Sequence, residues 1–524
     1  MTTRPDSASR RSNASARPPS LGGRVGRGLV PRAPGHQLWA SIDIGSNSFR
    51  LELARLTGER YQRVSYIKES VRLGAGLDAQ GMLTEEAMQR GLACLKGFGD
   101  QLVGIPPERI RAVATQTLRE ARNRNAFLAR AEAVLGHPVE VIAGREEARM
   151  IFAGVARLQP SNQPRLVIDI GGRSTEMILG RGRKPLLAES FGVGSVGLSL
   201  RFFGEGRYTA EAFRAAQVAA GAELEEALTL FRPELWQEAL GSSGTVGAVS
   251  QILAAAGQTD GRITPAALRW CIERCIAAGS QDKLQLPGLK DDRRPVVAGG
   301  LCILYTLLTQ FGIDELLPTK GALRQGVIFD LAERLQPSGA RDPRGASVAE
   351  LQLRFGVDVA QAERVAAQAE RLYRHLAPKP SAELLRELRW AAALHEIGML
   401  VSHHDHHRHS AYLIAHVDAP GFSTNQLQRL GALALGQRGG LRKLEPQLAD
   451  PALLEQIVAL RLAVILCHAR TPVQGTGPML RRDGRQLTLR SPKSWSEGQA
   501  RTRFLLKEEA EAWARTDLLE LSVA

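Results

Sequence analysis

Two stretches of the chain share one order of apolar and polar residues. Residues 39–54 read WASIDIGSNSFRLELA, and residues 165–180 read RLVIDIGGRSTEMILG. Each is an apolar run with an aspartate near its end, then a turn of glycine and hydroxyl residues, then a return to apolar positions. Such a run is typical of a buried strand, and a glycine-containing turn between two of them is typical of a hairpin. The repeat therefore predicts two homologous domains that face each other, each beginning with a β-hairpin.

Helical and strand-like patterns alternate after each hairpin. In the first half we expect helices over 85–102, 118–135 and 146–158, and strands over 110–115 and 139–144. The second half continues with a loop followed by a helix over 239–253, and with a closing helix over 322–335. Alternation of strands and helices is typical of the α/β class.

The pattern changes after a linker rich in proline, glycine and arginine at 336–347. Val365, Ala369, Leu372 and Leu376 follow at helical spacing, and helices are expected to dominate to about residue 470. Residues 481–495 and 500–507 predict two short strands, followed by an acidic helix over 508–520. The expected organisation is a disordered tail at 1–36, α/β domains at 37–160 and 161–336, a helical domain at 345–475 and a small C-terminal α+β segment at 476–524.

The composition indicates a globular chain with an excess of positive charge. The net charge is +14, and the tail at 1–36 supplies part of it with seven arginines against one aspartate. The serine, proline and glycine content of this tail predicts disorder, and the tail lacks the apolar segment of a secretory signal. The remaining chain is also basic, which suits a polyanionic partner.

Neither a membrane span nor a disulfide framework is expected. The longest apolar stretch, at 296–308, is shorter than the ~20 residues needed to cross a bilayer. The five cysteines form no CxxC pair, and Cys271 and Cys275 lie one helical turn apart, as on a shared buried face. Scattered cysteines of this kind are typical of reduced thiols, so we expect a cytoplasmic protein without membrane insertion.

Three loops of glycine and hydroxyl residues suit phosphate binding. Glycine lets neighbouring N–H groups converge on an anion, and serine or threonine adds hydroxyl donors. The third loop, GSSGT at 241–245, also precedes a predicted helix whose N-terminus could face phosphate. One such loop can simply turn the chain, but three together favour binding. The candidate contacts are Ser46, Asn47, Ser48, Gly171, Gly172, Arg173, Ser174, Thr175, Ser243, Gly244 and Thr245.

Acidic residues accompany the first two loops. A carboxylate inside an apolar strand is costly unless its charge is offset. Because Mg²⁺ binds a few carboxylates together with phosphate oxygens of a substrate, Asp43, Asp169 and Glu176 are candidate metal ligands. Hydrogen bonds from turn amides are the alternative. In GREEARMIF, Glu147 falls at the third helical position if Gly144 is the N-cap, where a glutamate commonly serves only as a capping residue.

Together the motifs resemble a known family. IDIGSNSFRL, ATQTLREA, GREEARMIF, VIDIGGRSTEMILG, GSSGT and GALRQGV occur in the order seen in the exopolyphosphatase/guanosine pentaphosphate phosphatase (Ppx/GppA) family, of the acetate kinase/Hsp70/actin superfamily. The resemblance covers about residues 38–520, and WAAALHEIGM and HRHSAYL are similar to an HD phosphohydrolase domain. It implies an α/β fold of two actin-like (ribonuclease H-like) domains, followed by a mostly helical HD-like domain and a small α+β segment. It also implies a homodimer.

The resemblance implies roles for individual residues. Glu147 is similar to the family's catalytic base, and Arg119 to an arginine that contacts substrate phosphate. Asp169 and Glu176 correspond to the acids of a magnesium site, and Asp43 with Ser46, Asn47 and Ser48 would form the first phosphate loop. The implied mechanism is in-line attack of water on a terminal phosphoryl group, with positioning and electrostatics supplying most of the catalysis.

Two departures from the family pattern are visible. The third glycine of the second loop is replaced by Arg173, which tolerates a positive φ poorly and could crowd the phosphate or donate a fork of hydrogen bonds to it. In the HD-like motif, Glu396 after His395 and Val464 stand where aspartates are usual, so we expect a non-catalytic extension that guides long polyanions. The dense histidines at 403–409 are expected to form a solvated loop.

The sequence thus favours an exopolyphosphatase, which releases orthophosphate from inorganic polyphosphate in a Mg²⁺-dependent reaction. Hydrolysis of the 5′-phosphate of guanosine pentaphosphate is the nearest alternative, because the same site can perform it. An ATP-dependent kinase of the same superfold and a non-catalytic polyphosphate-binding regulator are alternatives of other classes.

Overall fold

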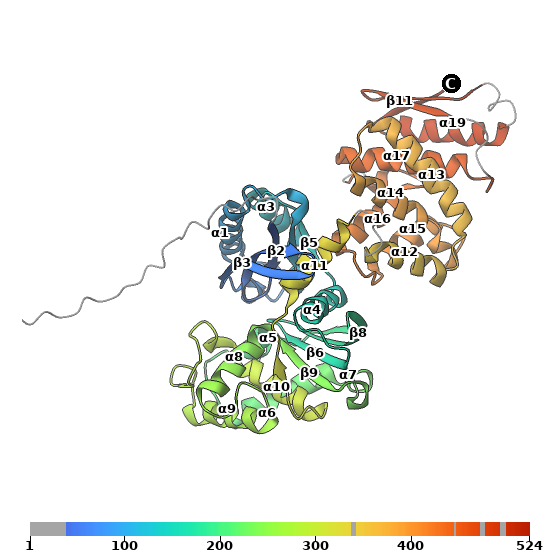
Figure 1. Ribbon diagram of the computed structural model, residues 1–524. Coiled ribbons are helices and arrows are strands. Elements are labelled where there is room, and N and C mark those ends of the chain that lie inside the picture. The colour runs from blue at the N-terminus through green and yellow to red at the C-terminus, as the bar shows by residue number, and fades with distance from the viewer. Residues whose placement is uncertain (1–37, 337–341, 445–446, 472–476, 493–498) are drawn as a thin grey trace, which may run out of the picture.

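The computed structural model describes residues 38–336, 342–444, 447–471, 477–492 and 499–524. The tail at 1–36 lies outside the described residues. Two lobes built on β-sheets are followed by a mostly helical module, and α4 and α11 lie where these parts meet (Figure 1). This arrangement confirms the predicted fold class, whereas the domain boundaries stay predictions.

Within residues 38–158 the first lobe has one sheet, in the order β3-β2-β1-β4-β5. β1, β2 and β3 are antiparallel neighbours, and β4 and β5 continue the sheet in parallel with β1. The strands are β1 (Leu38–Ile44), β2 (Phe49–Thr57), β3 (Arg60–Glu69), β4 (Ile110–Ala114) and β5 (Val139–Val141). The helices are η2 (Leu73–Gly76), α1 (Glu85–Leu102), η3 (Pro107–Arg109), α2 (Gln116–Glu120), α3 (Arg124–Leu135) and α4 (Gly144–Leu158).

The second lobe repeats this topology over residues 164–334. Its sheet order is β10-β9-β6-β7-β8, so that β6 to β10 correspond one by one to β1 to β5. The strands are β6 (Pro164–Ile170), β7 (Thr175–Arg181), β8 (Lys184–Phe191), β9 (Glu238–Ser242) and β10 (Leu317–Pro318). The helices are α5 (Ser195–Phe203), α6 (Ala210–Leu224), α7 (Ala227–Leu230), η4 (Pro233–Leu235), α8 (Ser243–Ala255), α9 (Pro265–Ala278), η5 (Arg294–Val296), α10 (Val297–Gln310) and α11 (Leu323–Arg334).

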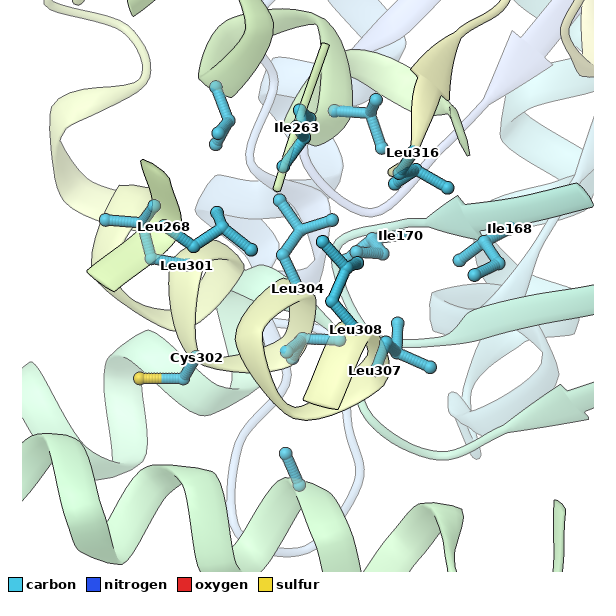
Figure 2. Close-up of a cluster of buried hydrophobic side chains, with 14 of the residues drawn as sticks. Ile168, Ile170, Ile263, Leu268, Leu301, Cys302, Leu304, Leu307, Leu308 and Leu316 are labelled. Carbon is cyan, nitrogen blue, oxygen red and sulfur yellow. The ribbon is translucent and has the colours of Figure 1, made fainter. Parts of the chain in front are cut away.

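The apolar run of β6 is explained by helices on both faces of the sheet. Ile168 and Ile170 point toward α10, whose Leu304 and Leu308 pack in the same cluster (Figure 2). Val167 points the other way and belongs to a second cluster with residues of α4 and α11. A strand buried on both faces is continuously apolar instead of alternating. The one carboxylate of this strand, Asp169, is costly in such surroundings unless a functional role or a nearby positive charge offsets it.

Helices α4 and α11 join the two lobes. Ile151 of α4 and Val327 of α11 share a buried cluster with Val113 of the first sheet and Val167 of the second. The two helix backbones touch at Gly326, where an added Cβ would lie 1.7 Å from the Met150 carbonyl oxygen. This shared packing fixes the position of α4 relative to both hairpins.

The helical module and the C-terminal strands share one hydrophobic core, in which Trp513 and Leu487 pack with the helices. Its elements are α12 (Pro343–Arg354), α13 (Val359–Leu376), α14 (Ala382–Ala393), η6 (Ile397–Leu400), α15 (His406–His416), α16 (Thr424–Gly436), η7 (Arg442–Leu444), η8 (Gln447–Ala449), α17 (Pro451–Leu466), β11 (Met479–Asp483), β12 (Gln486–Arg490), α19 (Ala500–Ala514) and β13 (Glu520–Val523). In the described part of the chain no helix is long and apolar enough to span a bilayer.

Some predicted elements are wrong. The helix expected over 118–135 is broken, because the Asn123 side chain exchanges hydrogen bonds of 2.9 and 3.0 Å with the backbone of Leu83. The strand expected over 500–507 is the start of helix α19, whose Leu506 and Trp513 are both buried and lie two helical turns apart. The loop expected at the start of 239–253 is strand β9, which pairs in parallel with β6.

The histidine-rich segment also differs from expectation. His403 and His404 are exposed, but His406 and His407 are buried in the first turn of α15. The expected solvated loop is therefore wrong for these two residues. Cys271 and Cys275 lie buried on one face of α9, as predicted, and all five cysteines are free.

Candidate active site

A cavity of about 290 Å³ lies between the two lobes, where the carboxyl ends of β1, β6 and β9 meet. Most of the predicted site residues line it: Asp43, Ser46, Asn47, Ser48, Glu147, Asp169, Gly171, Gly172, Ser174, Ser243, Gly244 and Thr245. The remaining predicted residues, Arg119, Arg173, Thr175 and Glu176, are not among the described residues that line it. The duplicated topology thus brings together three loops that are far apart in the sequence.

The first loop offers an unused hydroxyl to the cavity. Ser48 is almost fully buried, and its Oγ has no hydrogen-bond partner among the described residues. Ser46 Oγ, by contrast, accepts a 2.8 Å hydrogen bond from Thr117 Oγ1. A buried hydroxyl without a partner is unfavourable unless a ligand completes it, so Ser48 is suited to an anionic oxygen.

The third loop is held in a strained conformation at the start of α8. Ser243 has φ +90°, which is costly for a residue other than glycine. Its Oγ accepts a hydrogen bond of 3.2 Å from the Thr245 amide, which caps part of the helix start. Gly244 lines the cavity beside it, so the N-terminal end of this 13-residue helix faces the space between the lobes. Helix N-termini favour anions in this position.

Several hydroxyls predicted to bind phosphate are instead used within the protein. Thr175 Oγ1 donates to the Val193 carbonyl oxygen at 2.6 Å, and Thr245 Oγ1 donates to the Ile170 carbonyl oxygen at 2.9 Å. Both contacts fix the backbone around the second loop. The backbone N–H groups of the loops remain the candidate phosphate donors.

The two hairpins carry different charges at equivalent positions. In the first, Asp43 lies opposite Arg50, and Arg50 Nη1 donates to Asp43 Oδ2 at 2.8 Å. In the second, Asp169 lies opposite another acid, Glu176. The first aspartate is therefore neutralised by its cross-strand neighbour, whereas the second has no cation at that position.

This shortage of positive charge is visible in the acid pKa values of the second lobe. Burial raises the pKa of Asp169 to about 6, although Ser242 and Arg50 act in the opposite direction. Burial, together with the nearby Glu147 and Asp169, raises the pKa of Glu176 well above its ordinary range. Buried carboxylates that lie close together each make ionisation of the other less favourable. A cation bound between them would stabilise both ionised forms.

Glu147 enters the cavity from the first turns of α4. The helix begins at Gly144 with Ala143 as its N-cap, so the predicted Gly144 cap is wrong and Glu147 is the fourth helical residue. The Glu147 carboxylate does not accept from helix amides but from Arg119, whose Nη1 lies 2.8 Å from Oε2. Burial raises the pKa of Glu147 to about 7, despite the opposing effect of Arg119. A carboxylate with this pKa can act as a general base near neutral pH.

The glycine at position 144 allows α4 to approach the second lobe. A Cβ at Gly144 would lie 2.4 Å from the Cβ of Ser190 on β8. Ser190 Oγ in turn donates to Glu176 Oε1 at 2.8 Å. Any larger residue at 144 would push the start of α4, and with it Glu147, away from the acids of the second hairpin.

Arg119 is committed to holding Glu147. Besides that contact, its Nη1 donates to the Ile142 carbonyl oxygen at 2.9 Å, and its Nε donates to Gln116 Oε1 at 2.9 Å. This geometry makes Arg119 a positioning residue for the Glu147 carboxylate. Its expected contact with substrate phosphate stays a prediction.

The residues present fit a divalent cation shared with substrate. Among the described residues, no group of three or more His, Cys, Asp and Glu side chains is arranged to bind a metal by itself. Mg²⁺, however, commonly takes only one or two carboxylates and completes its shell with water and substrate phosphate. Asp169 lines the cavity and has a raised pKa, with Glu176 behind it. A cation beside Asp169 would offset the negative charge of both carboxylates.

The cavity also contains cations that sequence reasoning missed. The basic side chains that line it are Arg50, Lys68, Arg293, Lys320 and Arg324. Arg324 is fixed by Glu52, 3.0 Å from its Nε, and lies over the Tyr66 ring at 4.9 Å. Register could have identified Arg50, since it stands where the second hairpin has Glu176. The basic lining matches the polyanionic partner expected from the charge.

Arg173 is neither strained nor inside the cavity. It is not among the described residues with positive φ, so the expected strain is wrong. Its Nη2 lies 2.8 Å from Glu120 Oε2 in the first lobe, and its Nη1 donates to the Gly74 carbonyl oxygen at 3.4 Å. In this structure Arg173 therefore bridges the two lobes at the edge of the cavity. A direct contact with phosphate stays a prediction.

We expect Arg173→Ala to change kcat/KM for phosphate release by less than about fivefold. The Arg173 and Glu120 side chains are 26% and 32% exposed, and such pairs contribute only about 0.2–1 kcal/mol. Glu120→Gln is the matched variant, and the double variant should show no larger effect than either single one. A loss above 100-fold for Arg173→Ala alone would contradict the bridging role and indicate direct phosphate binding.

Comparisons with known proteins agree with this geometry. Residues 53–335 match the sequence model of the Ppx/GppA phosphatase family, and residues 344–510 match domain III of Ppx/GppA phosphatases. A guanosine-5′-triphosphate,3′-diphosphate pyrophosphatase of Aeromonas hydrophila is 38% identical over 497 residues, which cover 92% of this chain and 99% of that protein.

Solved structures are similar to the two lobes. An exopolyphosphatase-like protein is 25% identical, with a TM-score of 0.51, over 56% of this chain and 97% of that one. An exopolyphosphatase from Cytophaga hutchinsonii is 24% identical, with a TM-score of 0.52, over 57% of this chain and 99% of that one. The second similarity concerns the fold alone.

Proposed function

Because the chain belongs to the Ppx/GppA phosphatase family, we propose that it hydrolyses the terminal 5′-phosphoanhydride bond of guanosine pentaphosphate. The products are guanosine tetraphosphate and orthophosphate. The observation that carries the reaction class is Glu147, a buried carboxylate with its pKa raised to about 7, in a cavity lined by the three loops of glycine and hydroxyl residues. The substrate is supported by similarity along nearly the whole chain to a pyrophosphatase named for that nucleotide.

The preference for polyphosphate expected from the sequence is thereby revised. The full-length relative supports the guanosine pentaphosphate alternative better than an exopolyphosphatase. The family similarity is to phosphatases, and it gives no support to a kinase or to a regulator without turnover. Exopolyphosphatase activity remains the second candidate, favoured by the cationic cavity and by the structure named exopolyphosphatase-like.

The loops bind and orient the phosphoryl group. Backbone N–H groups of 45–48, 171–174 and 243–245 and the Ser48 hydroxyl are the proposed donors to its oxygens. Arg324 and Lys68, which also line the cavity, are the proposed sources of positive charge. Held in this way, the terminal phosphorus presents one face to Glu147, which satisfies the in-line geometry of phosphoryl transfer.

Glu147 positions the attacking water and accepts its proton. The bond from the water oxygen to phosphorus forms while the bond from phosphorus to the bridging oxygen breaks, and the leaving nucleotide keeps that electron pair. Arg119 holds the carboxylate in place through its 2.8 Å contact. Asp169, with Glu176 behind it, would hold Mg²⁺. When bound, that ion would neutralise charge on the phosphate oxygens.

A comparison of substrates tests this proposal. Purified protein with Mg²⁺ is given guanosine pentaphosphate, long-chain polyphosphate or GTP, and kcat/KM for orthophosphate release is measured. We expect guanosine pentaphosphate to exceed polyphosphate at least tenfold, with GTP as the control that lacks the 3′-diphosphate. The reverse order would establish the exopolyphosphatase instead, and no release from any of them would overturn the reaction class.

A further inference from the structure

The helical module contains a second cavity, of about 710 Å³. It lies among α13, η6, the start of α15, the end of α16, α17 and α19, and it shares no lining residue with the cavity between the lobes. Volumes of roughly 300–1,000 Å³ are typical of pockets for small molecules. Its position away from the catalytic cavity means that its occupant would be a different molecule from the one being hydrolysed.

The floor of this cavity holds buried polar atoms that lack partners. His406 is 5% exposed and Gln437 is 3% exposed, yet neither His406 Nδ1 nor Gln437 Oε1 has a hydrogen-bond partner among the described residues. Both residues line the cavity. Buried polar groups are normally satisfied, so these two atoms indicate a missing partner with hydrogen-bonding groups of its own.

His395 is the third residue at the floor of the cavity, and one of its ring nitrogens remains available as a hydrogen-bond acceptor. His395 Nδ1 lies 2.6 Å from the Ala392 carbonyl oxygen. Because a carbonyl only accepts, Nδ1 carries the proton and Nε2 presents a lone pair. Its nearest acid, Glu396, is 3.8 Å from Nε2, beyond hydrogen-bond distance. The floor therefore offers acceptors and suits a ligand that donates hydrogen bonds.

The rim of the cavity carries more basic than acidic side chains: Arg438, Arg470 and Arg515 line it together with the exposed Glu508, and Arg470 is paired with Glu396. Arg438 is exposed and forms no ion pair with any described residue, and Arg515 is mostly exposed, 3.8 Å from Glu511. The buried acid Glu509 is already neutralised by Arg461, whose Nη2 lies 2.7 Å from it. Arg438 and Arg515 thus remain available to an anion at the mouth.

A metal ion explains these features less well. No cluster of three or more His, Cys, Asp and Glu residues in the described ranges could hold one. Burial lowers the pKa of His406 to about 4, so this ring is neutral at physiological pH and serves as a hydrogen-bonding group, not as a cation. The anion would be bound at the rim, and an uncharged polar body at the floor.

We propose that this cavity binds a nucleoside phosphate at a site separate from the catalytic cavity. The base and ribose supply N–H and O–H donors to His395 and Gln437 and form a further hydrogen bond with His406 Nδ1, which donates or accepts according to its tautomer. The phosphate pairs with Arg438 and Arg515. The inference does not depend on which substrate the catalytic cavity hydrolyses.

Histidine NMR signals of the full-length protein test the proposal selectively. Among the described residues, no histidine lines the catalytic cavity, whereas His395, His403, His406 and His468 line the second one. With ¹⁵N-labelled histidine, millimolar GMP should shift the signals of these four residues in a saturable way. Inorganic phosphate should require at least tenfold higher concentration, because it lacks the donor-rich body.

Arg438→Glu provides the matched variant. It is a surface change, expected to raise the apparent dissociation constant for GMP at least tenfold. Arg442→Glu, an exposed arginine nearby that does not line the cavity, should leave it unchanged. Equal affinity for GMP and inorganic phosphate would overturn the nucleoside assignment. Histidine signals that respond to neither molecule, or shifts that Arg438→Glu leaves intact, would overturn the site.

Discussion

Glu147→Gln is expected to lower kcat for orthophosphate release by about 10²–10⁴-fold, the range that a positioned general base contributes. The amide has nearly the same volume and can still accept from Arg119, so the cavity keeps its shape. What is lost is the ability to take a proton from water. KM should change little, because the loops and cations proposed to bind phosphate are untouched. Steady-state kinetics at saturating Mg²⁺ measures both quantities.

The pH dependence distinguishes a base from a merely structural carboxylate. Since burial raises the pKa of Glu147 to about 7, the protonated and inactive form dominates below that pH. The kcat/KM of the natural protein should therefore fall as pH decreases through about 7 at low Mg²⁺. Added Mg²⁺ disfavours the protonated form and should move this limb to lower pH. The residual kcat/KM of Glu147→Gln should not show this decrease at low pH.

Glu189→Gln is the matched control for this experiment. Glu189 is also a carboxylate near the start of α4, but it pairs with Arg145 and does not line the catalytic cavity. Its kinetics should equal those of the natural protein. A Glu147→Gln protein that keeps its turnover and its pH limb would remove Glu147 from the role of base.

The parts of the site that could be predicted from sequence are those encoded locally. Each hairpin is a continuous segment, so its apolar run, its aspartate and its turn are visible together, and the repeat itself indicates that the two copies face each other. The same holds for Glu147, which lies near the start of a clearly periodic helix. Their meeting in one cavity follows from the duplicated sheet topology.

The parts that could not be predicted depend on contacts between distant segments. Lys68, Arg293 and Lys320 enter the cavity from three separate loops or strands, and no local pattern marks them. The position of Arg173 within a glycine loop predicts a contact with phosphate, but its side chain turns to Glu120 in the other lobe. A basic residue next to a glycine loop does not reveal in which direction its long side chain extends.

Burial in the helical module was equally hidden. The histidines at 403–409 form an unbroken polar pattern, yet His406 and His407 are buried because α15 packs closely against η6 and α16. Apolar periodicity predicts the face of a helix that meets the core, but it does not identify polar residues that line an internal cavity. The second cavity became visible only from the tertiary structure.

The second large effect concerns stability, at a buried charge cluster that links α4 and α11. Asp330 of α11 is 2% exposed, accepts hydrogen bonds from Arg111 and Arg149, and forms an ion pair with Arg334, whose Nε lies 2.6 Å away. Arg334 Nη2 also donates to the Gly421 carbonyl oxygen of the helical module at 2.7 Å. One carboxylate thus connects β4, α4, α11 and the helical module.

Asp330→Asn is expected to destabilise the protein by about 3–5 kcal/mol, the usual cost of removing one partner from a buried ion pair. Asparagine has the same shape, so no cavity forms, but the three guanidinium groups would lose the carboxylate that they share and keep only their contacts with Glu140 and Glu146. The midpoint of urea-induced unfolding at pH 7 measures the effect. Asp418→Asn, which removes an exposed partner of Arg145, is the control and should shift the midpoint little.

The pH dependence of this difference follows from the sign of the pKa shift. Burial alone would raise the pKa of Asp330, but Arg334, Arg149 and Arg111 together hold it well below its ordinary range. A depressed folded-state pKa gives stability that is fully present above the unfolded value of about 4 and is lost as pH falls toward the folded one. The gap between the natural protein and Asp330→Asn should therefore be constant from pH 7 to 5 and narrow below about 4. Equal midpoints for Asp330→Asn and Asp418→Asn at pH 7 would show that the cluster does not join the lobes to the helical module energetically.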